Sequence, residues 1–266
     1  MLDGVRAIVL DVDGTLVHRD GDRIYVEPGA KAVLERIRSS GRRLAIFTNG
    51  SHEPPAWFAA GLRDVGLDVA DDEMLTPLLS VREYLRMRRL DGPVLLFATD
   101  SVSEYLTAEG MNVAGPADRP DAVFVAHPGT LDFAHLERAA RAIMAGARLL
   151  TASYVAAYAG ANGPILSRGA MTAAALAKAS STRPVIVGKP SRAAIRTIEN
   201  RLGTRGSELV VIGDDVTMDV AMGKMDGTRT ILVASGITGR PDPESIPERR
   251  RPDAIVDGVA ELLDWL

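Results

Sequence analysis

The sequence contains no cysteine among its 266 residues. This absence excludes disulfide scaffolds, thiolate metal sites and cysteine nucleophiles, and it suits the reducing conditions of a cytoplasmic location. Aromatic residues make up only 5% of the chain, and no aromatic platform for stacking bases is visible. No apolar run approaches the roughly 20 residues that a membrane-spanning helix needs. We therefore expect no disulfide framework and no membrane segment.

A strong charge of one sign is also missing, because the formal net charge is only −4. Acidic and basic residues are mixed along the chain, and the basic run at residues 249–251 is too short to form a nucleic-acid-binding surface. The apolar run at residues 7–10 already reads as a core strand, so we expect no targeting segment before it. Hydrophobic residues make up 46% of the chain, which is enough for one large domain or two smaller ones.

Short apolar runs alternate with longer amphipathic stretches in both terminal parts of the chain. This βα rhythm predicts a parallel sheet covered by helices on both faces. The strands are expected at residues 7–10, 44–47, 184–187, 209–212 and 230–233. The helices are expected at residues 28–40, 54–65, 191–202, 217–225 and 259–265, the last one packing on the sheet edge.

The middle of the chain has an α/β pattern of its own. Its strands are expected at residues 94–98, 122–125 and 148–151, and its helices at residues 77–90, 131–145 and 170–179. We interpret this part as a second domain inserted into the first. The predicted fold is a Rossmann-like, doubly wound α/β core formed by residues 1–74 and 184–266, with an inserted α/β domain at residues 75–183.

The sequence DVDGT at residues 11–15 directly follows the first expected strand. Ligands of open α/β sheets bind beyond the carboxyl ends of the strands, so its position indicates a site. Asp11 and Asp13 are one residue apart and would point the same way on a strand. Two ionised carboxylates that close together need a shared cation or proton. Gly14 then permits a sharp change of chain direction, although an ordinary acidic turn is the simpler alternative.

Three further strand ends carry polar residues. Thr48 and Asn49 follow the second strand, Lys189 follows the strand at residues 184–187, and Asp214 follows the strand at residues 209–212, with Asp219 about one helical turn later. Each of these signals is weak alone, because turns and solvated lysines are common. Together they predict one site at the edge of a single sheet.

This set of motifs resembles the haloacid dehalogenase superfamily. The matching features are DxDGT, a threonine after the second strand, a later lysine, and the pattern GDxxxxD at residues 213–219. The position of the inserted domain, the sequence GKP at residues 188–190 and the segments at residues 230–233 and 235–238 are similar to the class IIA cap branch. The resemblance implies a phosphatase with an α/β cap domain that acts on a small phosphorylated metabolite.

The chemistry of phosphate esters predicts part of the site independently. A phosphate monoester is anionic and hydrolyses very slowly without catalysis, so its charge must be neutralised. Hard oxygen ligands suit Mg²⁺, which Asp11, Asp214 and a backbone carbonyl near Asp13 would bind. Lys189 would add positive charge and keep Asp11 ionised. The phosphoryl oxygens would be held by Thr48, Asn49 and Gly50.

The remaining roles are implied by the resemblance alone. Asp11 is then the nucleophile that forms an aspartyl phosphate, and Asp13 protonates the leaving oxygen and later activates water. Asp219 is an outer partner of the Mg²⁺ ion, which completes a metal set of Asp11, Asp13, Asp214 and Asp219. The resemblance also implies that a homodimer could form through the cap.

Some positions depart from the family pattern. Residues 152–156 read ASYVA where the branch has a TNxD-like loop, so the substrate cannot be named from the sequence. Asp215 stands where relatives carry arginine and receives no role, and Met218 replaces a threonine. The four histidines lack the spacing of metal ligands and are expected on the surface or in turns. His52 follows the Thr48 loop, which leaves a substrate contact open.

Two other functions remain compatible with the motifs. A phosphomutase or another phosphoryl-transfer enzyme could use the same scaffold, whereas Asp13 argues against a dehalogenase, which has no leaving alcohol to protonate. A non-catalytic, receiver-like signalling module also groups acids, a threonine and a lysine on a parallel sheet. Such modules are about half as long and lack DxDGT.

Overall fold

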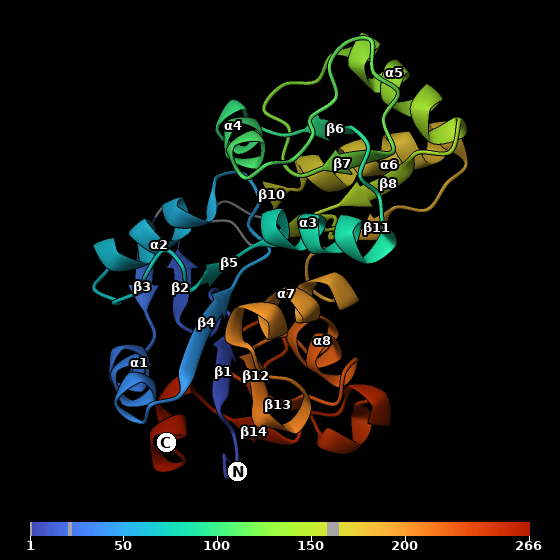
Figure 1. Cartoon of the computed structure of the whole chain (residues 1–266). Helices are drawn as coiled ribbons and strands as arrows, with labels where there is room; N and C mark the ends of the chain where they lie inside the picture. Colours follow the sequence, from blue (N-terminus) through green and yellow to red (C-terminus); the bar gives the residue numbers. More distant parts are fainter. Residues whose placement is uncertain (1, 21–22, 159–164) are drawn as a thin grey trace.

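The computed structural model describes residues 2–20, 23–158 and 165–266. Within them the chain forms two parallel sheets and two short antiparallel hairpins (Figure 1). The larger sheet has the strand order β14–β13–β12–β1–β4–β5, and the second sheet has the order β11–β8–β7–β6. All neighbouring strands within these two sheets are parallel. This topology confirms the predicted α/β class.

The larger sheet and its helices form the lower part of the molecule in Figure 1. Its strands are β1 (Ala7–Leu10), β4 (Arg43–Phe47), β5 (Met74–Leu75), β12 (Leu209–Gly213), β13 (Arg229–Val233) and β14 (Ala254–Val256). Its helices are α1 (Ala30–Ser39), α2 (Pro55–Asp64), α7 (Arg192–Leu202) and the short α8 (Ala221–Lys224).

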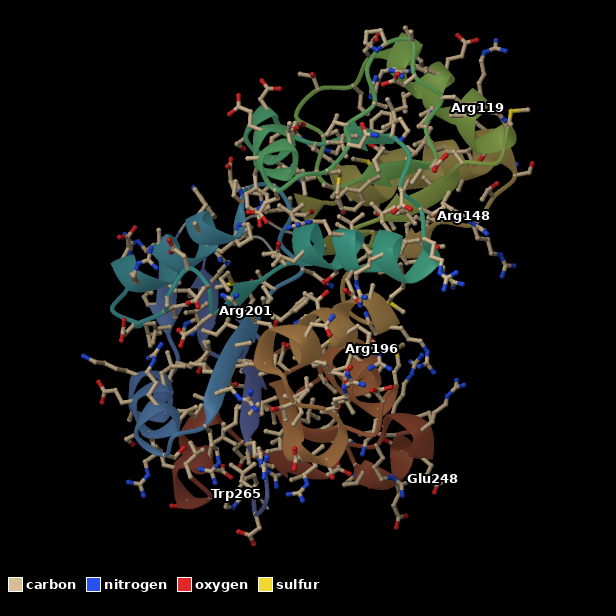
Figure 2. The ribbon with its side chains drawn as sticks, viewed as in Figure 1. Arg119, Arg148, Arg196, Arg201, Glu248 and Trp265 are labelled. Atoms are coloured by element: carbon tan, nitrogen blue, oxygen red, sulfur yellow. The ribbon has the colours of Figure 1, made fainter. Side chains whose placement is uncertain are left out.

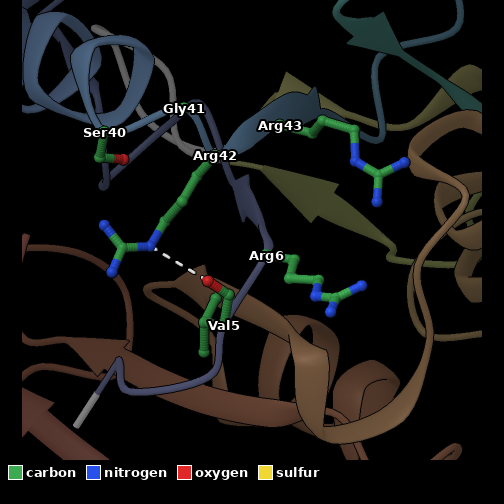
Figure 3. Close-up of a pocket in the computed structure, with 6 residues that line it drawn as sticks. All are labelled: Val5, Arg6, Ser40, Gly41, Arg42 and Arg43. Carbon is green, nitrogen blue, oxygen red and sulfur yellow. Dashed lines mark hydrogen bonds between the residues drawn. The ribbon is translucent and has the colours of Figure 1, made fainter.

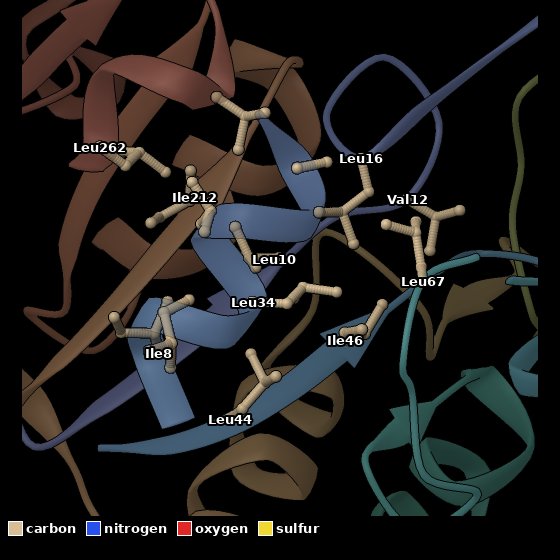
Figure 4. Close-up of a cluster of buried hydrophobic side chains, with 14 of the residues drawn as sticks. Ile8, Leu10, Val12, Leu16, Leu34, Leu44, Ile46, Leu67, Ile212 and Leu262 are labelled. Carbon is tan, nitrogen blue, oxygen red and sulfur yellow. The ribbon is translucent and has the colours of Figure 1, made fainter. Parts of the chain in front are cut away.

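Both faces of this sheet are covered, which explains why β1 and β12 are apolar throughout. Successive strand side chains point to opposite faces. Ile8 and Leu10 therefore join a cluster with Leu34 of α1 (Figure 4), whereas Ala7 and Val9 pack with α7 on the other side. Burial of this apolar surface stabilises the sheet by about 25 cal/mol per Å². The carboxyl ends of its central strands are thereby held in fixed positions.

The second sheet has the same two-sided construction. Its strands are β6 (Val94–Phe97), β7 (Ala122–Val125), β8 (Arg148–Thr151) and β11 (Val185–Ile186), and its helices are α3 (Pro77–Arg88), α4 (Asp100–Ala108), α5 (Phe133–Met144) and α6 (Arg168–Ser180). Phe124 packs with α3 and α4 on one face, and Val123 and Val125 pack with α5 and α6 on the other. Arg148, at the amino end of β8, is exposed at the outer side of this part of the molecule (Figure 2).

The strand expected at residues 184–187 belongs to a different sheet from the one predicted. β11 pairs with β8, through the registers Val185 to Leu150 and Ile186 to Thr151, so it closes the second sheet instead of opening the C-terminal half of the larger one. A two-residue apolar strand carries no signal that tells which sheet edge it joins. The division into domains at residues 75 and 184 stays a prediction.

Several other elements differ from the sequence-based expectation. The helix expected at residues 217–225 begins as a π-helical turn (Val216–Val220) before α8, and the last segment is a 3₁₀ helix (Val259–Asp264) that packs on α1 and β14. The sequence analysis missed α4, β5, β14 and the hairpins β2 (Val17–Asp20) with β3 (Arg23–Val26) and β9 (Ala157–Tyr158) with β10 (Ile165–Leu166). Further short 3₁₀ turns lie at Gly206–Glu208, Pro243–Ser245 and Glu248–Arg250.

Candidate active site

Lys189 lies at the centre of the site, where its side chain is only 4% exposed. Its Nζ donates hydrogen bonds to Asp11, to Oδ1 of Asp219 at 2.6 Å and to the backbone oxygen of Phe47 at 3.1 Å. Asp11 follows β1, Phe47 ends β4, and Asp219 lies in the π-helical turn after β12. One ammonium group thus joins the ends of three adjacent strand–loop units of the larger sheet.

Asp214 completes a cluster of buried carboxylates with Asp11 and Asp219. One oxygen from each of these three residues lies within 4.8 Å of the others. Asp214 directly follows β12, and its Oδ2 accepts a hydrogen bond of 2.6 Å from the backbone N–H of Ile237. Gly14, at φ 80°, leaves the space for this carboxylate, because a Cβ there would come within 2.3 Å of Oδ2. The strand ends therefore meet, as the sequence predicted.

The electrostatics of the cluster show an excess of negative charge. Burial, together with the neighbouring carboxylates, raises the pKa of Asp11 well above its usual value despite the opposing effect of Lys189. Burial likewise raises the pKa of Asp219, and it raises the pKa of Asp214 to about 6. Burial alone would lower the pKa of Lys189, but Asp11 and Asp219 outweigh it and raise that pKa. One lysine charge does not balance three buried carboxylates.

Asn49 connects the two sheets through its side chain. Its Nδ2 donates to the backbone oxygen of Lys189 at 3.0 Å, and its Oδ1 accepts from the backbone N–H of Lys189 at 2.7 Å. Gly188 must be a glycine here, because a Cβ would lie 2.3 Å from the backbone oxygen of Ala152 and 2.5 Å from Oδ1 of Asn49. The Asn49 side chain therefore positions Lys189, a role that sequence reasoning did not assign to it.

Thr48 is buried beside Asn49, and its Oγ1 accepts a hydrogen bond of 3.1 Å from the backbone N–H of Gly50. The backbone N–H of Thr48 is used within the sheet, where it bonds to Leu75 at 3.2 Å. The Thr48 hydroxyl keeps its own proton available for donation. The three residues predicted to hold phosphoryl oxygens thus form one tight loop after β4.

Asp13 lies apart from the carboxylate cluster. Its side chain is 51% exposed and accepts a hydrogen bond of 2.5 Å from Nε of Arg19, which lies on β2. The expectation that Asp11 and Asp13 point the same way is wrong, because β1 ends at Leu10 and the chain turns at Asp13, where it bridges to Val17. Among the described residues, the carboxylate of Asp13 is not grouped with the three metal-ligating candidates.

Asp215 and Met218 occupy the same segment. Oδ1 of Asp215 accepts hydrogen bonds from the backbone N–H of Thr217 at 2.6 Å and from its hydroxyl at 2.7 Å, so Asp215 caps the π-helical turn. The sulfur of Met218 lies 3.4 Å from Nδ2 of Asn49. Both residues support the loops that carry Asp214 and Asn49.

The carboxyl ends of the second sheet face this site. Thr99, after β6, donates to the backbone oxygen of His52 at 3.0 Å, and His127, after β7, lies with its ring centroid 5.8 Å from that of His52. After β8, the backbone oxygen of Ala152 accepts from Gly188 at 3.1 Å, and β11 leads directly into Lys189. The site therefore lies between two sheet edges.

A surface depression at the amino ends of the larger sheet's strands lacks the carboxylates of the Lys189 site. It has a volume of about 380 Å³ and lies beside the amino ends of β1 and β4 (Figure 3). Arg42 there donates to the backbone oxygen of Val5 at 3.1 Å, and no carboxylate lines the depression. Ligands of parallel sheets bind at the carboxyl ends, which argues for the Lys189 site.

Sequence reasoning missed Arg19 and the contact between His52 and His127. Arg19 belongs to a hairpin whose polar, alternating sequence gave no motif. His52 and His127 are 75 positions apart and meet only because two separate sheets face each other. Each of the two histidines follows shortly after an expected strand, and this position was the signal that could have indicated a site residue.

Two family models match the chain. The model of haloacid dehalogenase-like hydrolases matches residues 8–112, and a HAD-hydrolase-like model matches residues 186–262, so together they span more than half of the sequence. Ribonucleotide monophosphatase NagD of Escherichia coli (strain K12) is 28% identical over 263 residues, which cover 97% of this chain and 98% of that protein.

Two solved structures are similar over nearly the whole chain. 4-Nitrophenylphosphatase from Thermotoga maritima has a TM-score of 0.84 and 26% identity, covering 99% of this chain and 98% of its own. Glycerol phosphate phosphatase from Mycobacterium tuberculosis, in complex with calcium, has a TM-score of 0.83 and 25% identity, covering 98% of this chain and 73% of its own. The motifs, the buried cluster and these matches agree, and the chain belongs to the haloacid dehalogenase-like hydrolases, in the class IIA branch that includes NagD and the p-nitrophenyl phosphatases.

Proposed function

We propose that the protein is a Mg²⁺-dependent phosphatase that hydrolyses a small phosphorylated metabolite through an aspartyl phosphate at Asp11. The observation that carries this proposal is the buried contact of Lys189 with Asp11 and Asp219 beside Asp214. A lysine and three carboxylates buried together are costly for stability, and such a cluster is typical of a catalytic site.

The donor set fits a divalent cation. Three buried carboxylates and one ammonium leave an excess of two negative charges when all are ionised, and burial together with the neighbouring carboxylates raises the pKa values of the acids. Oxygen ligands of this kind suit Mg²⁺. Asp11 and Asp214 would hold the ion, with Asp219 beside them. When bound, Mg²⁺ supplies positive charge that favours binding of the phosphoryl group.

The residues of the chain would carry out two displacement steps. In the first, a carboxylate oxygen of Asp11 forms a bond to phosphorus while the bond from phosphorus to the leaving oxygen breaks, and Asp13 gives its proton to that oxygen. In the second, Asp13 takes a proton from water, the water oxygen bonds to phosphorus, and orthophosphate leaves Asp11. Lys189 lowers the pKa of Asp11 against the effect of burial and thereby favours the ionised, nucleophilic carboxylate.

Two further groups would hold the phosphoryl oxygens. The hydroxyl of Thr48 has a free proton, and among the described residues no hydrogen bond occupies the backbone N–H of Asn49. Donors that are already in place stabilise the charge on the equatorial oxygens without reorganisation. Asp13 must leave its contact with Arg19 or share it with the leaving group.

The test is phosphate release from p-nitrophenyl phosphate and from a panel of phosphorylated metabolites, with Mg²⁺ and with a chelator. We expect turnover that needs the metal and disappears in Asp11→Asn. A requirement for a sugar bisphosphate would indicate a phosphomutase instead. A long-lived phosphoaspartate without turnover would indicate a signalling module. Absence of any phosphoester hydrolysis by folded, Mg²⁺-loaded protein would contradict the proposal.

Two expectations from the sequence remain predictions. These are a homodimer formed through residues 75–183 and a cytoplasmic location. In the described part of the chain, no helix is both long and apolar enough to cross a membrane. The molecular mass in solution, compared with 28.3 kDa for one chain, tests the first of them.

A further inference from the structure

The four histidines fall into two pairs with different bonding. His18 lies 3.0 Å from Oε1 of Glu27, and Nε2 of His135 lies 3.0 Å from the backbone oxygen of Leu96. Within the described residues, the rings of His52 and His127 have no hydrogen-bond partner, although both are half-buried. Half-buried nitrogens without a protein partner are available to a ligand or to water.

The rings of His52 and His127 are held in place by aromatic packing. Their centroids lie 5.8 Å apart at 65°, and the ring of His52 also contacts Phe58 at 5.0 Å and Trp57 at 5.1 Å in edge-to-face arrangements. Such edge-to-face packing restricts the orientation of the rings. His52 comes from the larger sheet and His127 from the second, so the pair spans the junction where the site lies.

His52 directly follows the loop of residues 48–51 after β4, which carries the proposed phosphoryl-binding residues. Arg19 forms the ion pair with Asp13 and is also close enough to His52 to lower its pKa. In the proposed mechanism Asp13 protonates the leaving oxygen, so the leaving group faces Asp13. A leaving group longer than a few atoms would therefore extend toward His52 and His127.

The pKa values of both imidazoles are lowered, which favours their neutral forms. Burial lowers the pKa of His52, Glu53 raises it and Arg19 lowers it again. Burial, His52 and Arg168 all lower the pKa of His127. A neutral imidazole offers one N–H donor and one nitrogen acceptor.

The charged groups around the pair are engaged by other parts of the protein. Arg19 pairs with Asp13, Glu53 accepts a hydrogen bond of 2.8 Å from Ser101, and Arg168 donates to the backbone oxygen of Gly129 at 3.1 Å. The loop at residues 152–156 contributes no charged side chain. The surroundings therefore favour hydrogen bonding to uncharged groups over binding of a second anion.

We propose that His52 and His127 together bind the leaving group, and that they select phosphomonoesters whose leaving group carries uncharged hydroxyl groups. This inference rests on the proposed phosphatase function and adds the substrate class. A site built to hydrogen-bond a substrate hydroxyl discriminates strongly against analogues that lack it. The imidazoles would take the place of the polar residues that the ASYVA loop lacks.

The test compares kcat/KM for glycerol 3-phosphate and ribose 5-phosphate with that for p-nitrophenyl phosphate, whose leaving group has no hydroxyl besides the reacting oxygen. His52→Phe and His127→Phe keep an aromatic ring and remove the ring nitrogens. Each variant should lower kcat/KM for the hydroxylated substrates about tenfold relative to p-nitrophenyl phosphate. His127→Gln should restore part of the selectivity, because an amide can donate and accept.

Both kcat/KM values are measured on the same preparation of each variant. Their ratio, hydroxylated substrate over p-nitrophenyl phosphate, therefore does not depend on the fraction of folded protein. His135→Gln is the matched control, because this histidine lies in the second sheet's part of the molecule and is already bonded to Leu96. Its ratio should stay at the wild-type value. An unchanged ratio in both Phe variants overturns the inference, as does a selective loss of 2-phosphoglycolate, which would mean that the pair binds an anion. Lack of turnover of every compound overturns the phosphatase itself.

Discussion

The edge of the larger sheet and the edge of the second sheet face each other but differ in chemistry. The first presents the buried carboxylates of Asp11, Asp214 and Asp219, two of which accept hydrogen bonds from Lys189. The second supplies Lys189 at the end of β11, and it otherwise presents uncharged side chains such as Thr99 and His127. The steps common to all phosphate esters need strong, fixed charges, whereas recognition of a neutral leaving group needs directional hydrogen bonds.

This contrast predicts two kinds of variant. Changes at the charged edge should reduce turnover of every phosphomonoester by similar factors, because the phosphoryl group is common to them. Changes among the uncharged side chains of the second sheet's edge, such as Thr99 and His127, should alter the selectivity between substrates and reduce turnover by smaller factors. The following experiments test this division.

The largest effect is expected from Asp11→Asn. The substitution removes the proposed nucleophile, so kcat should fall by at least about 10⁴-fold for every substrate. Initial rates with p-nitrophenyl phosphate and with the metabolite panel measure it. Asp72→Asn is the matched control, because Asp72 is exposed and pairs with Arg201 at 3.0 Å. Residual activity above a few per cent in Asp11→Asn, free of wild-type contamination, would rule out the covalent mechanism.

Lys189→Met should reduce both activity and stability. Without the ammonium group, Asp11 and Asp219 stay buried without their common partner. Loss of one partner of a buried ion pair costs about 3–5 kcal/mol, which urea unfolding in a chelator should detect as a lower free energy of unfolding. We expect kcat to fall by about 10³-fold or more.

Lys224→Met serves as the comparison for Lys189→Met. Lys224 also pairs with an aspartate, Asp253, at 2.6 Å, but this pair is partly exposed. Its loss should cost only about 0–1 kcal/mol and leave kcat unchanged. Equal destabilisation by the two substitutions would mean that burial of the Lys189 cluster does not matter energetically.

Stabilisation by Mg²⁺ should depend on pH. The pKa of Asp214 is raised to about 6 in the folded protein, so without metal this group stabilises the fold at low pH, and the contribution is lost as the pH rises through about 6. Mg²⁺ needs the ionised form and competes with the proton. The increase in Tm caused by Mg²⁺ should therefore be large at pH 7.5 and shrink below pH 6.

Calorimetry of Asp214→Asn provides the control for this pH dependence. The substitution removes one of the proposed ligands, so most of the increase in Tm on adding Mg²⁺ should be lost at pH 7.5. An increase of equal size at pH 5 and pH 7.5 in the wild-type protein would place the metal away from these carboxylates.

The smallest effect is expected from Ser101→Ala at the uncharged edge. Ser101 donates to Glu53 at 2.8 Å and thereby links α4 to the loop that carries His52. A single hydrogen bond of this kind is worth about 0.5–1.5 kcal/mol, so KM should rise less than about tenfold and kcat should change little. Ser103→Ala, which removes a bond within α4 at 3.0 Å, should leave KM unchanged. A fall in kcat comparable to that of Lys189→Met would contradict the division.

The sequence predicted the charged edge better than the uncharged one for a physical reason. Asp11 and Asp214 follow neighbouring apolar strands of the larger sheet, and parallel strands end at a common edge, so order along the chain was enough to bring these two carboxylates together. Asp13 shows the limit of this reasoning, because the chain had already left the strand and turned the carboxylate toward Arg19.

The sheet to which β11 belongs also could not be predicted from the order of the strands along the chain. Its two residues are apolar, as in any buried strand, but hydrogen bonding to β8 places it in the second sheet. Lys189 therefore reaches the charged edge from the opposite side of the junction. The prediction of one sheet edge was too simple, although the predicted meeting of the residues was correct.

The amino-acid sequence by itself determined the α/β class and the meeting of Asp11 with Asp214, because local apolar periodicity and strand-end positions encode them. Only the tertiary structure decided which sheet takes β11, where Asp13 points, and that His52 meets His127. These outcomes depend on how two separately formed layers pack against each other, and such long-range contacts leave no local pattern in the sequence.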